Sequence, residues 1–159
     1  GIMVVASAGN EGPGCSTIAD PPANHSQLTF SVGATNNSMK IASFSSRGPS
    51  ALDAAVGPDI VAPGVNIRSA VPGNGYQSMS GTSMSGPHIV GVVALLWSAN
   101  KNYVGRIAET AAVLTKTAKP LTGGDNCGDL AGNAIPNNTY GYGFVDVLAA
   151  VKAATQVRR

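Results

Sequence analysis

Eight residues, Gly81-Thr82-Ser83-Met84-Ser85-Gly86-Pro87-His88, lead directly into an apolar run at residues 89–97. Small residues followed by a hydroxyl and an apolar run predict a tight turn that feeds a buried helix, which we expect to end near residue 98 or 100. Ser83 would lie at the start of that helix, where unpaired N–H groups and the helix dipole favour negative charge. The position suits a nucleophilic serine, but Ser83 taken alone favours the interpretation of a serine that only caps the helix.

The composition is typical of one compact domain. Of the 159 residues, 43% are hydrophobic and only 11% are charged, and 20 are glycine. The formal net charge of +2 is too small to indicate a nucleic acid or a membrane surface as a partner. Basic residues stand side by side only at Arg158 and Arg159. No apolar stretch has the length of a membrane span, and we find no signal-peptide pattern.

The first residues predict the class of fold. Residues 1–8 form an apolar run without alternation, which is typical of a strand buried on both faces of a parallel sheet. Such a strand indicates an α/β protein. Its neighbours in the sheet must come from elsewhere, so we expect the chain to be part of a larger domain. Residues 28–34, 41–49 and 59–67 predict further short strands.

Two more helices are expected after the one that begins near Ser83. The first spans about residues 104–117, and its buried stripe is formed by Val104, Ile107, Ala108, Ala111 and Leu114. A polar loop rich in Gly, Asn and Asp follows at residues 119–143. Asp146 then predicts the N-cap of a final helix that runs to about residue 154.

The octapeptide resembles the G-T-S-M-[AS]-x-P-H signature of subtilisin-like serine proteases, in which the serine is the nucleophile. Further segments resemble this family in the same order: A-[AS]-A-G-N-E-G at residues 6–12, A-x-F-S-x-x-G at 42–48, D-[IV]-x-A-P-G at 59–64 and Y-G-x-G-x-[IV]-[DN] at 140–146. The sequences of residues 57–60 and 67–73 are similar to those of bacillopeptidase F-type members. The resemblance implies the C-terminal part of a subtilisin-like three-layer α/β fold. That fold has a mainly parallel sheet, with Ser83 at the start of a buried central helix.

The resemblance implies a role for two polar groups. In the family, the serine matched by Ser83 attacks the peptide carbonyl, and the asparagine matched by Asn10 donates to the resulting oxyanion. The chemistry fits, because a carboxamide NH2 is a neutral donor and the Ser83 backbone N–H supplies a second one. Without the resemblance, Asn10 would be interpreted as a turn residue that bonds its own backbone. His25 and His88 are not expected to act as the base, because the family carries its base in its other half.

The resemblance also implies a pocket for the substrate side chain that precedes the cleaved bond. Ala8 and Gly9 would belong to one wall, and Glu11 would lie at the rim. Asp20 would lie at the floor, just before Pro21-Pro22, whose peptide bond we expect to be cis. A carboxylate at the floor would favour a Lys or Arg side chain. The alternative is that Asp20 turns away and caps its own loop.

A serine nucleophile of this kind needs a histidine base and an aspartate that orients it. The family supplies them from H-G-[TS] and D-[ST]-G motifs, and neither occurs in this sequence. The resemblance therefore implies that residues 1–159 are the C-terminal half of a serine endopeptidase domain, inactive or nearly so alone. Its partners would be polypeptide substrates and the N-terminal half of the same domain. The alternative is a non-catalytic pseudoprotease or binding scaffold.

Cys15 and Cys127 lie far apart, and each is expected in a Gly-rich surface loop flanked by small or polar residues. These surroundings favour a long-range disulfide, and hence an extracellular, secreted protein, over two free thiols. The expected chemistry needs no cofactor. A structural calcium ion has little support, because Leu130 occupies the position where an EF-hand loop needs glycine. Four nearby side chains nevertheless carry oxygen atoms suited to calcium: Asp125, Asn126, Asp129 and Asn133.

Overall fold

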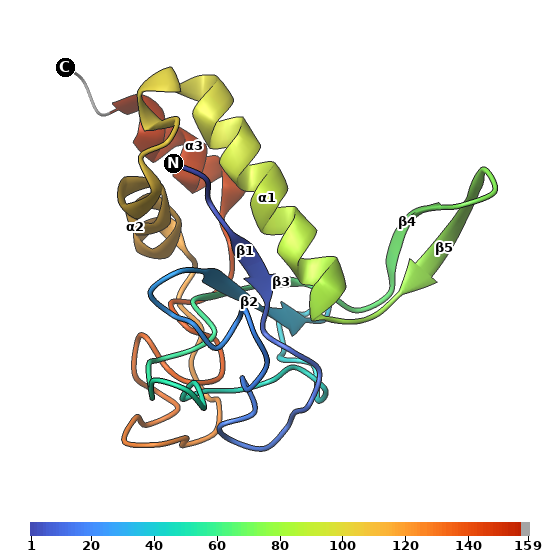
Figure 1. Ribbon diagram of the computed structural model, residues 1–159, viewed down its shortest axis with the longest axis vertical. Coiled ribbons are helices and arrows are strands. Elements are labelled where there is room, and N and C mark those ends of the chain that lie inside the picture. The colour runs from blue at the N-terminus through green and yellow to red at the C-terminus, as the bar shows by residue number, and fades with distance from the viewer. Residues whose placement is uncertain (157–159) are drawn as a thin grey trace.

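The computed structural model describes residues 1–156, so the basic pair Arg158-Arg159 lies outside the described residues. Figure 1 shows a small sheet with helices packed against it, loops on the other side, and a projecting hairpin. The strands are β1 (Val5–Ser7), β2 (Phe30–Thr35), β3 (Ile60–Pro63), β4 (Ile67–Val71) and β5 (Gly75–Met79). The helices are α1 (Thr82–Ala99), the 3₁₀ helix η1 (Lys101–Tyr103), α2 (Ile107–Thr117) and α3 (Val147–Gln156).

The sheet is parallel, with the strand order β1-β2-β3, as the α/β class predicts. All six residues of the central strand β2 are buried, whereas only Ala6 is buried in β1. The expectation that residues 1–8 form a strand buried on both faces is therefore wrong, and that environment is found at β2 instead. The reason is position: among residues 1–156, no strand pairs with the outer edge of β1.

The core lies between the sheet and α1, which packs across β1, β2 and β3 (Figure 1). The helix ends at Ala99, as expected, but it is not buried all round. Val90 and Leu95 are each 54% exposed, because no described element covers that side of α1. The main core cluster contains these buried residues: Phe30, Val32, Ile60, Ala62, Ile89, Val92, Val93, Leu114, Ala118, Val145 and Ala150.

The later helices follow the predicted order, with one boundary corrected. Helix α2 begins at Ile107, so Val104, which is 53% exposed, lies before it. Ala108 is also exposed, so neither residue belongs to the buried stripe. Thr110 is buried instead, because its Oγ1 accepts a hydrogen bond from the Trp97 indole (2.9 Å) and joins α2 to α1. Asp146 caps α3 as predicted: its Oδ1 accepts the Ala149 N–H at 2.8 Å.

Residues 41–49 do not form the predicted strand, apart from one isolated bridge at Ile41. Their backbone instead bonds the loop that follows β1. The Gly12 N–H donates to Phe44 O (2.8 Å), and the Thr17 N–H donates to Arg47 O (2.9 Å). The loop at residues 9–18 is thus held against a second irregular segment.

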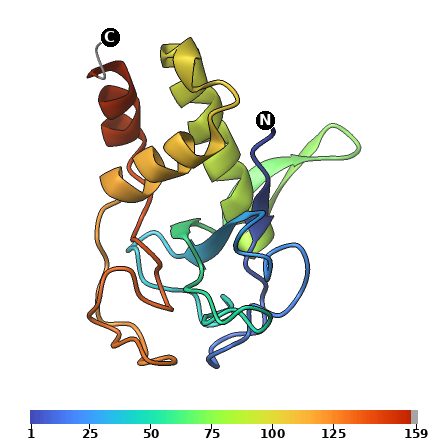
Figure 2. The same ribbon diagram turned by 60° about the vertical axis from the view of Figure 1, so that its left-hand side comes forward.

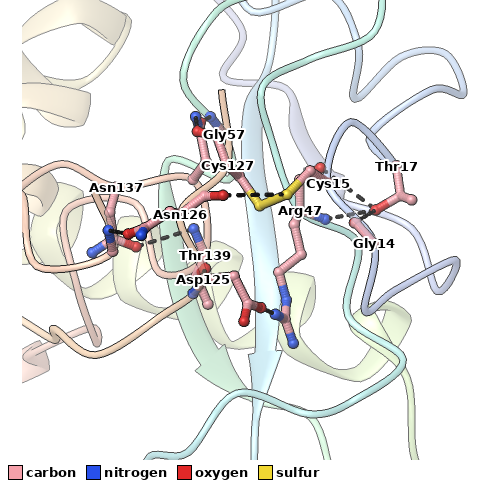
Figure 3. The surroundings of a disulfide bond; sticks show 12 residues. Gly14, Cys15, Thr17, Arg47, Gly57, Asp125, Asn126, Cys127, Asn137 and Thr139 are labelled. Atoms are coloured by element: carbon pink, nitrogen blue, oxygen red, sulfur yellow. Dashed lines mark hydrogen bonds and ion pairs between the residues drawn. A yellow bond between two sulfur atoms is a disulfide. The ribbon is translucent and has the colours of Figure 1, made fainter. Parts of the chain in front are cut away.

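The predicted disulfide between Cys15 and Cys127 is present, with the two Cα atoms 5.4 Å apart. Figure 3 shows Arg47 and Asp125 beside it. The two side chains form an ion pair in which Arg47 is buried and Asp125 is largely exposed. Cys127 is fully buried, so the description of both cysteines as surface residues is wrong for that one. The bridge fastens the loop after β1 to the long loop before α3.

Strands β4 and β5 form an antiparallel hairpin that projects away from the sheet (Figures 1 and 2). On this hairpin the Arg68 guanidinium lies over the Tyr76 ring, 4.3 Å from its centroid. Such a cation–π contact is favourable by about 0.5–1 kcal/mol at an exposed site. Within residues 1–156, no helix combines the length and the apolar content that a membrane crossing requires.

Asp59, just before β3, gives the fold a dependence on pH. Burial raises the pKa of this carboxyl above 3.8, although its Oδ2 accepts the Ser31 N–H (2.6 Å) and the Ser31 Oγ–H (2.8 Å). The folded chain therefore keeps this proton to a higher pH than the unfolded chain does, and the contribution of Asp59 to stability falls as pH rises through that window.

We expect Asp59→Asn to raise the free energy of unfolding at neutral pH, because the amide oxygen can still accept both bonds from Ser31 without carrying charge. The gain should shrink toward zero as pH falls below about 4, where the wild-type carboxyl is protonated in both states. Urea unfolding of both proteins across this range measures it. A gain that is independent of pH would contradict the assignment to Asp59.

Candidate active site

Hydrogen bonds to the segment that follows β3 fix the position at which α1 begins. The Gly81 N–H donates to Gly64 O (2.8 Å), and the Gly64 N–H donates to Thr35 O at the end of β2 (2.9 Å). The Ser85 hydroxyl reaches Ala62 O at 3.2 Å. A Cβ at Gly64 would collide with the Ser85 hydroxyl and would lie 2.6 Å from the Ala34 Cβ. Glycine is therefore required at this close approach, which sets where the helix begins.

Ser83 lies in the first turn of α1 and is exposed. Its backbone N–H has no hydrogen-bond partner within residues 1–156, as the geometry of a helix N-terminus leads one to expect. A surface pocket of about 320 Å³ adjoins it between α1 and β4. The pocket is lined by Ser83, Met84, Pro87 and His88 and by Ile67, Arg68 and Ser69.

Asn10 lies in the loop after β1, and its carboxamide is tied to the residue that precedes Ser83. The Thr82 N–H donates to Asn10 Oδ1 (2.9 Å), and Thr82 Oγ1 lies 3.1 Å from the same oxygen. A backbone N–H can only donate, so it selects the carboxamide oxygen and leaves Nδ2 on the other side. Among the described residues Nδ2 has no partner. Asn10 Nδ2 and the Ser83 N–H are thus two donors without a partner among residues 1–156, on residues that are linked through Thr82.

The two histidines of the chain lie in different places, and only His88 lines the pocket that adjoins Ser83. His88 lies one turn further along α1, with its Nδ1 2.8 Å from Met84 O, so that this ring nitrogen donates to the helix backbone. His25 lies in the loop before β2, where its carbonyl accepts the Leu28 N–H (3.0 Å). Neither ring forms a hydrogen bond to Ser83 in the part of the chain that the structure describes.

Three predicted pocket residues lie on the loop that carries Asn10. Ala8 is buried, and its N–H donates to Val32 O (3.0 Å), which continues the pairing of β1 with β2. Gly9 has φ 107°, a left-handed conformation that favours glycine. The Glu11 carboxylate is exposed and folds back, accepting a hydrogen bond from the Ser46 hydroxyl at 2.8 Å. Its charge is therefore held at a defined position beside Gly9.

Asp20 is exposed, and it lies in a loop that packs against β1. Ile18, two residues earlier, is buried in a cluster with Ala6 and Ala8. The Pro21-Pro22 bond is cis, as predicted. The Asn24 N–H bonds the Asp20 backbone carbonyl (3.2 Å), and within residues 1–156 the Asp20 carboxylate caps no N–H group. The capping role for the Asp20 side chain is therefore not seen among residues 1–156, and Asp20 does not line the pocket that adjoins Ser83.

Comparison with known proteins decides the family. The family model for subtilases (peptidase S8) matches residues 1–143. The chain belongs to the subtilase family. It is 46% identical over 156 residues to bacillopeptidase F of Bacillus subtilis (strain 168). The matched region covers 94% of this chain and 10% of bacillopeptidase F. It is 38% identical over 153 residues to subtilisin amylosacchariticus of Bacillus subtilis subsp. amylosacchariticus, covering 96% and 34% respectively.

A solved structure agrees with this assignment to the subtilases. The prenylagaramide maturation protease PagA superposes with a TM-score of 0.72 at 28% identity, over 97% of this chain and 51% of that one. The subtilisin-like α/β fold is therefore confirmed. This subtilase chain spans about half of the PagA chain and about a third of subtilisin amylosacchariticus.

Thr82 is the site residue that the sequence analysis missed. It is fully buried, and besides its two contacts with Asn10 its hydroxyl lies 3.2 Å from Gly9 O and 3.3 Å from Gly9 N. One residue therefore connects the loop after β1 to the start of α1. Its presence in the octapeptide was the available signal, but a threonine beside a serine carries no spacing that would reveal its partner.

We expect Asn10→Ala to lower kcat of the whole enzyme with little change in KM. The Asn10 carboxamide would bond the negatively charged oxyanion, which forms only after Ser83 has attacked the peptide carbonyl. In subtilisin, loss of one oxyanion donor costs about 10²–10³ in kcat, and we adopt that known magnitude here. Steady-state kinetics on a peptide substrate measure it. Asn37→Ala, at an exposed turn after β2, is the matched control. Equal kcat values for the two variants would contradict an oxyanion role.

Proposed function

We propose that Ser83 is the nucleophile of a serine endopeptidase. Its Oγ attacks the peptide carbonyl, a histidine takes the hydroxyl proton, and the tetrahedral oxyanion receives hydrogen bonds from Asn10 Nδ2 and the Ser83 N–H. The histidine then protonates the leaving amine, and water releases the acyl group from Ser83. The observation that carries the proposal is an exposed serine in the first turn of α1 whose preceding residue, Thr82, is hydrogen-bonded to Asn10, with the Ser83 N–H and Asn10 Nδ2 both unpaired among residues 1–156.

We further propose that the base and its aspartate come from an N-terminal half of the same catalytic domain. Neither His25 nor His88 forms a hydrogen bond to Ser83 among residues 1–156, and the two family motifs that would carry the base and its aspartate are absent from this sequence. Residues 1–159 by themselves would then be inactive or nearly so. The disulfide supports secretion of the whole protein, because such bonds persist in oxidising compartments. The proposed chemistry requires no cofactor.

A fluorophosphonate probe, which reacts with activated serines, tests this function. We expect the whole protein to be labelled at Ser83, as mapped by mass spectrometry of its peptides, and residues 1–159 alone to remain unlabelled. Absence of labelling in a correctly folded whole protein would overturn the proposal and would favour a pseudoprotease. Labelling of residues 1–159 alone would show that the base does not come from another segment.

For specificity, we propose that Asp20 selects a basic side chain before the cleaved bond. The free carboxylate in a loop anchored on β1 supports this, since a charge-assisted pair contributes about 1.5–3 kcal/mol. Asp20→Ser should therefore lower kcat/KM by about 10- to 100-fold for an arginine peptide and leave that for a matched phenylalanine peptide nearly unchanged. If both peptides respond equally, Asp20 does not line the pocket.

A further inference from the structure

Ser46 forms hydrogen bonds to the residues on both sides of Asn10 in the loop after β1. Its backbone N–H donates to Gly9 O (3.0 Å). Its hydroxyl accepts the Glu11 N–H (3.1 Å) and donates to Glu11 Oε2 (2.8 Å). Ser46 is fully buried whereas Glu11 is exposed, so the two bonds to Glu11 lie at the boundary between the protein interior and solvent. Asn10 lies between the two residues that are held.

The fit between this serine and the loop is close. A Cβ at Gly9 would lie 2.7 Å from the Ser46 hydroxyl, so the loop could not approach with any other residue at that position. Ser46 itself is fixed, because Phe44 and Arg47 on either side of it accept hydrogen bonds from Gly12 and Thr17 of the same loop. The backbone of Asn10 is thus held by Ser46 and its carboxamide by Thr82.

We propose that Ser46 is a positioning residue that holds the Asn10 loop in the geometry needed to receive the oxyanion. The inference rests on the proposed function and names a residue that supports its oxyanion donor. An exposed loop tip loses orientation when its backbone bonds are removed, and a preorganised donor must be held within a fraction of an ångström. Removal of the Ser46 hydroxyl frees the Glu11 N–H and the Glu11 carboxylate together.

The chain offers a matched control in the preceding residue. Ser45 is also fully buried, but its hydroxyl accepts the Ala34 N–H of β2 (3.0 Å) and makes no contact with the loop. In the whole enzyme we expect Ser46→Ala to lower kcat by about 10- to 100-fold with KM nearly unchanged. Ser45→Ala should leave kcat close to wild type. Thermal unfolding shows whether both variants are folded. Active-site titration gives the concentration of active enzyme, by which each rate is divided.

Two further measurements separate positioning from general destabilisation. If Ser46 acts through Asn10, then Ser46→Ala should have little further effect on kcat in an Asn10→Ala background. Hydrogen exchange at the Glu11 amide should be faster in Ser46→Ala than in Ser45→Ala or wild type, and this readout needs no activity. The proposal is overturned if the two serine variants have equal kcat, if the effects of Ser46→Ala and Asn10→Ala multiply, or if Glu11 exchange is unchanged. If the whole protein has no hydrolase activity, the proposed function fails, and the exchange rate still decides whether Ser46 holds the loop.

Discussion

Replacement of Ser83 by alanine is expected to abolish peptide hydrolysis by the whole protein. In subtilisin, loss of the nucleophile or the base alone lowers kcat by about 10⁶-fold, and we take that known value as the expected scale. The physical reason is that no acyl-enzyme forms without the Ser83 Oγ, while the unpaired Ser83 N–H and the Asn10 carboxamide remain to give a small residual rate. Because Ser83 is exposed, its truncation creates no cavity.

Measurement of kcat with a chromogenic peptide, together with the midpoint of thermal unfolding, checks this expectation. Ser78→Ala on strand β5 is the matched control, because it removes another exposed serine hydroxyl five residues earlier. We expect it to retain wild-type kcat. A Ser83→Ala variant that keeps a few per cent of the activity would show that another group is the nucleophile.

Loss of the disulfide is expected to have the largest effect on stability. The bridge joins residues separated by 112 positions. Closure of so long a loop contributes about 4–5 kcal/mol by restricting the unfolded chain, in the entropic model of disulfide stabilisation. We therefore expect replacement of both Cys15 and Cys127 by serine to lower the free energy of unfolding by that amount. For a chain of this size, the melting temperature should fall by roughly 10–20 °C.

Urea unfolding with and without reductant provides the measurement and its control. Reductant should destabilise the wild type by a similar amount and leave the double variant unchanged. Cys127 is fully buried, so a second double variant with alanine at position 127 separates the cost of a buried hydroxyl from the loss of the bridge. A double variant as stable as the oxidised wild type would contradict the expectation.

Short-range patterns were sufficient for several features of the fold. Helix α1 could be predicted because a small-residue turn precedes a long apolar run, and α3 because Asp146 caps it. The pairing of Cys15 with Cys127 could be predicted because each thiol has only one possible partner within the chain. In each case the signal lies within one segment or in one pair of residues.

The same patterns failed where burial depends on neighbours. Val90 and Leu95 are apolar, yet they are exposed because no described element lies over that side of α1. Residues 41–49 resemble a strand in composition, yet their hydrogen bonds go to the loop after β1. Propensity describes what a segment prefers by itself, and tertiary contacts override it.

For the candidate site, the sequence by itself determined which groups are present: a serine at a helix start, a neutral carboxamide donor, a glycine-rich turn and an acidic side chain before a proline pair. Only the tertiary structure decided how they are held. Thr82 and Ser46 bond Asn10 and its neighbours across separations of 72 and 35 residues. No local pattern encodes such bonds, because they form only after the sheet and α1 have brought distant loops together.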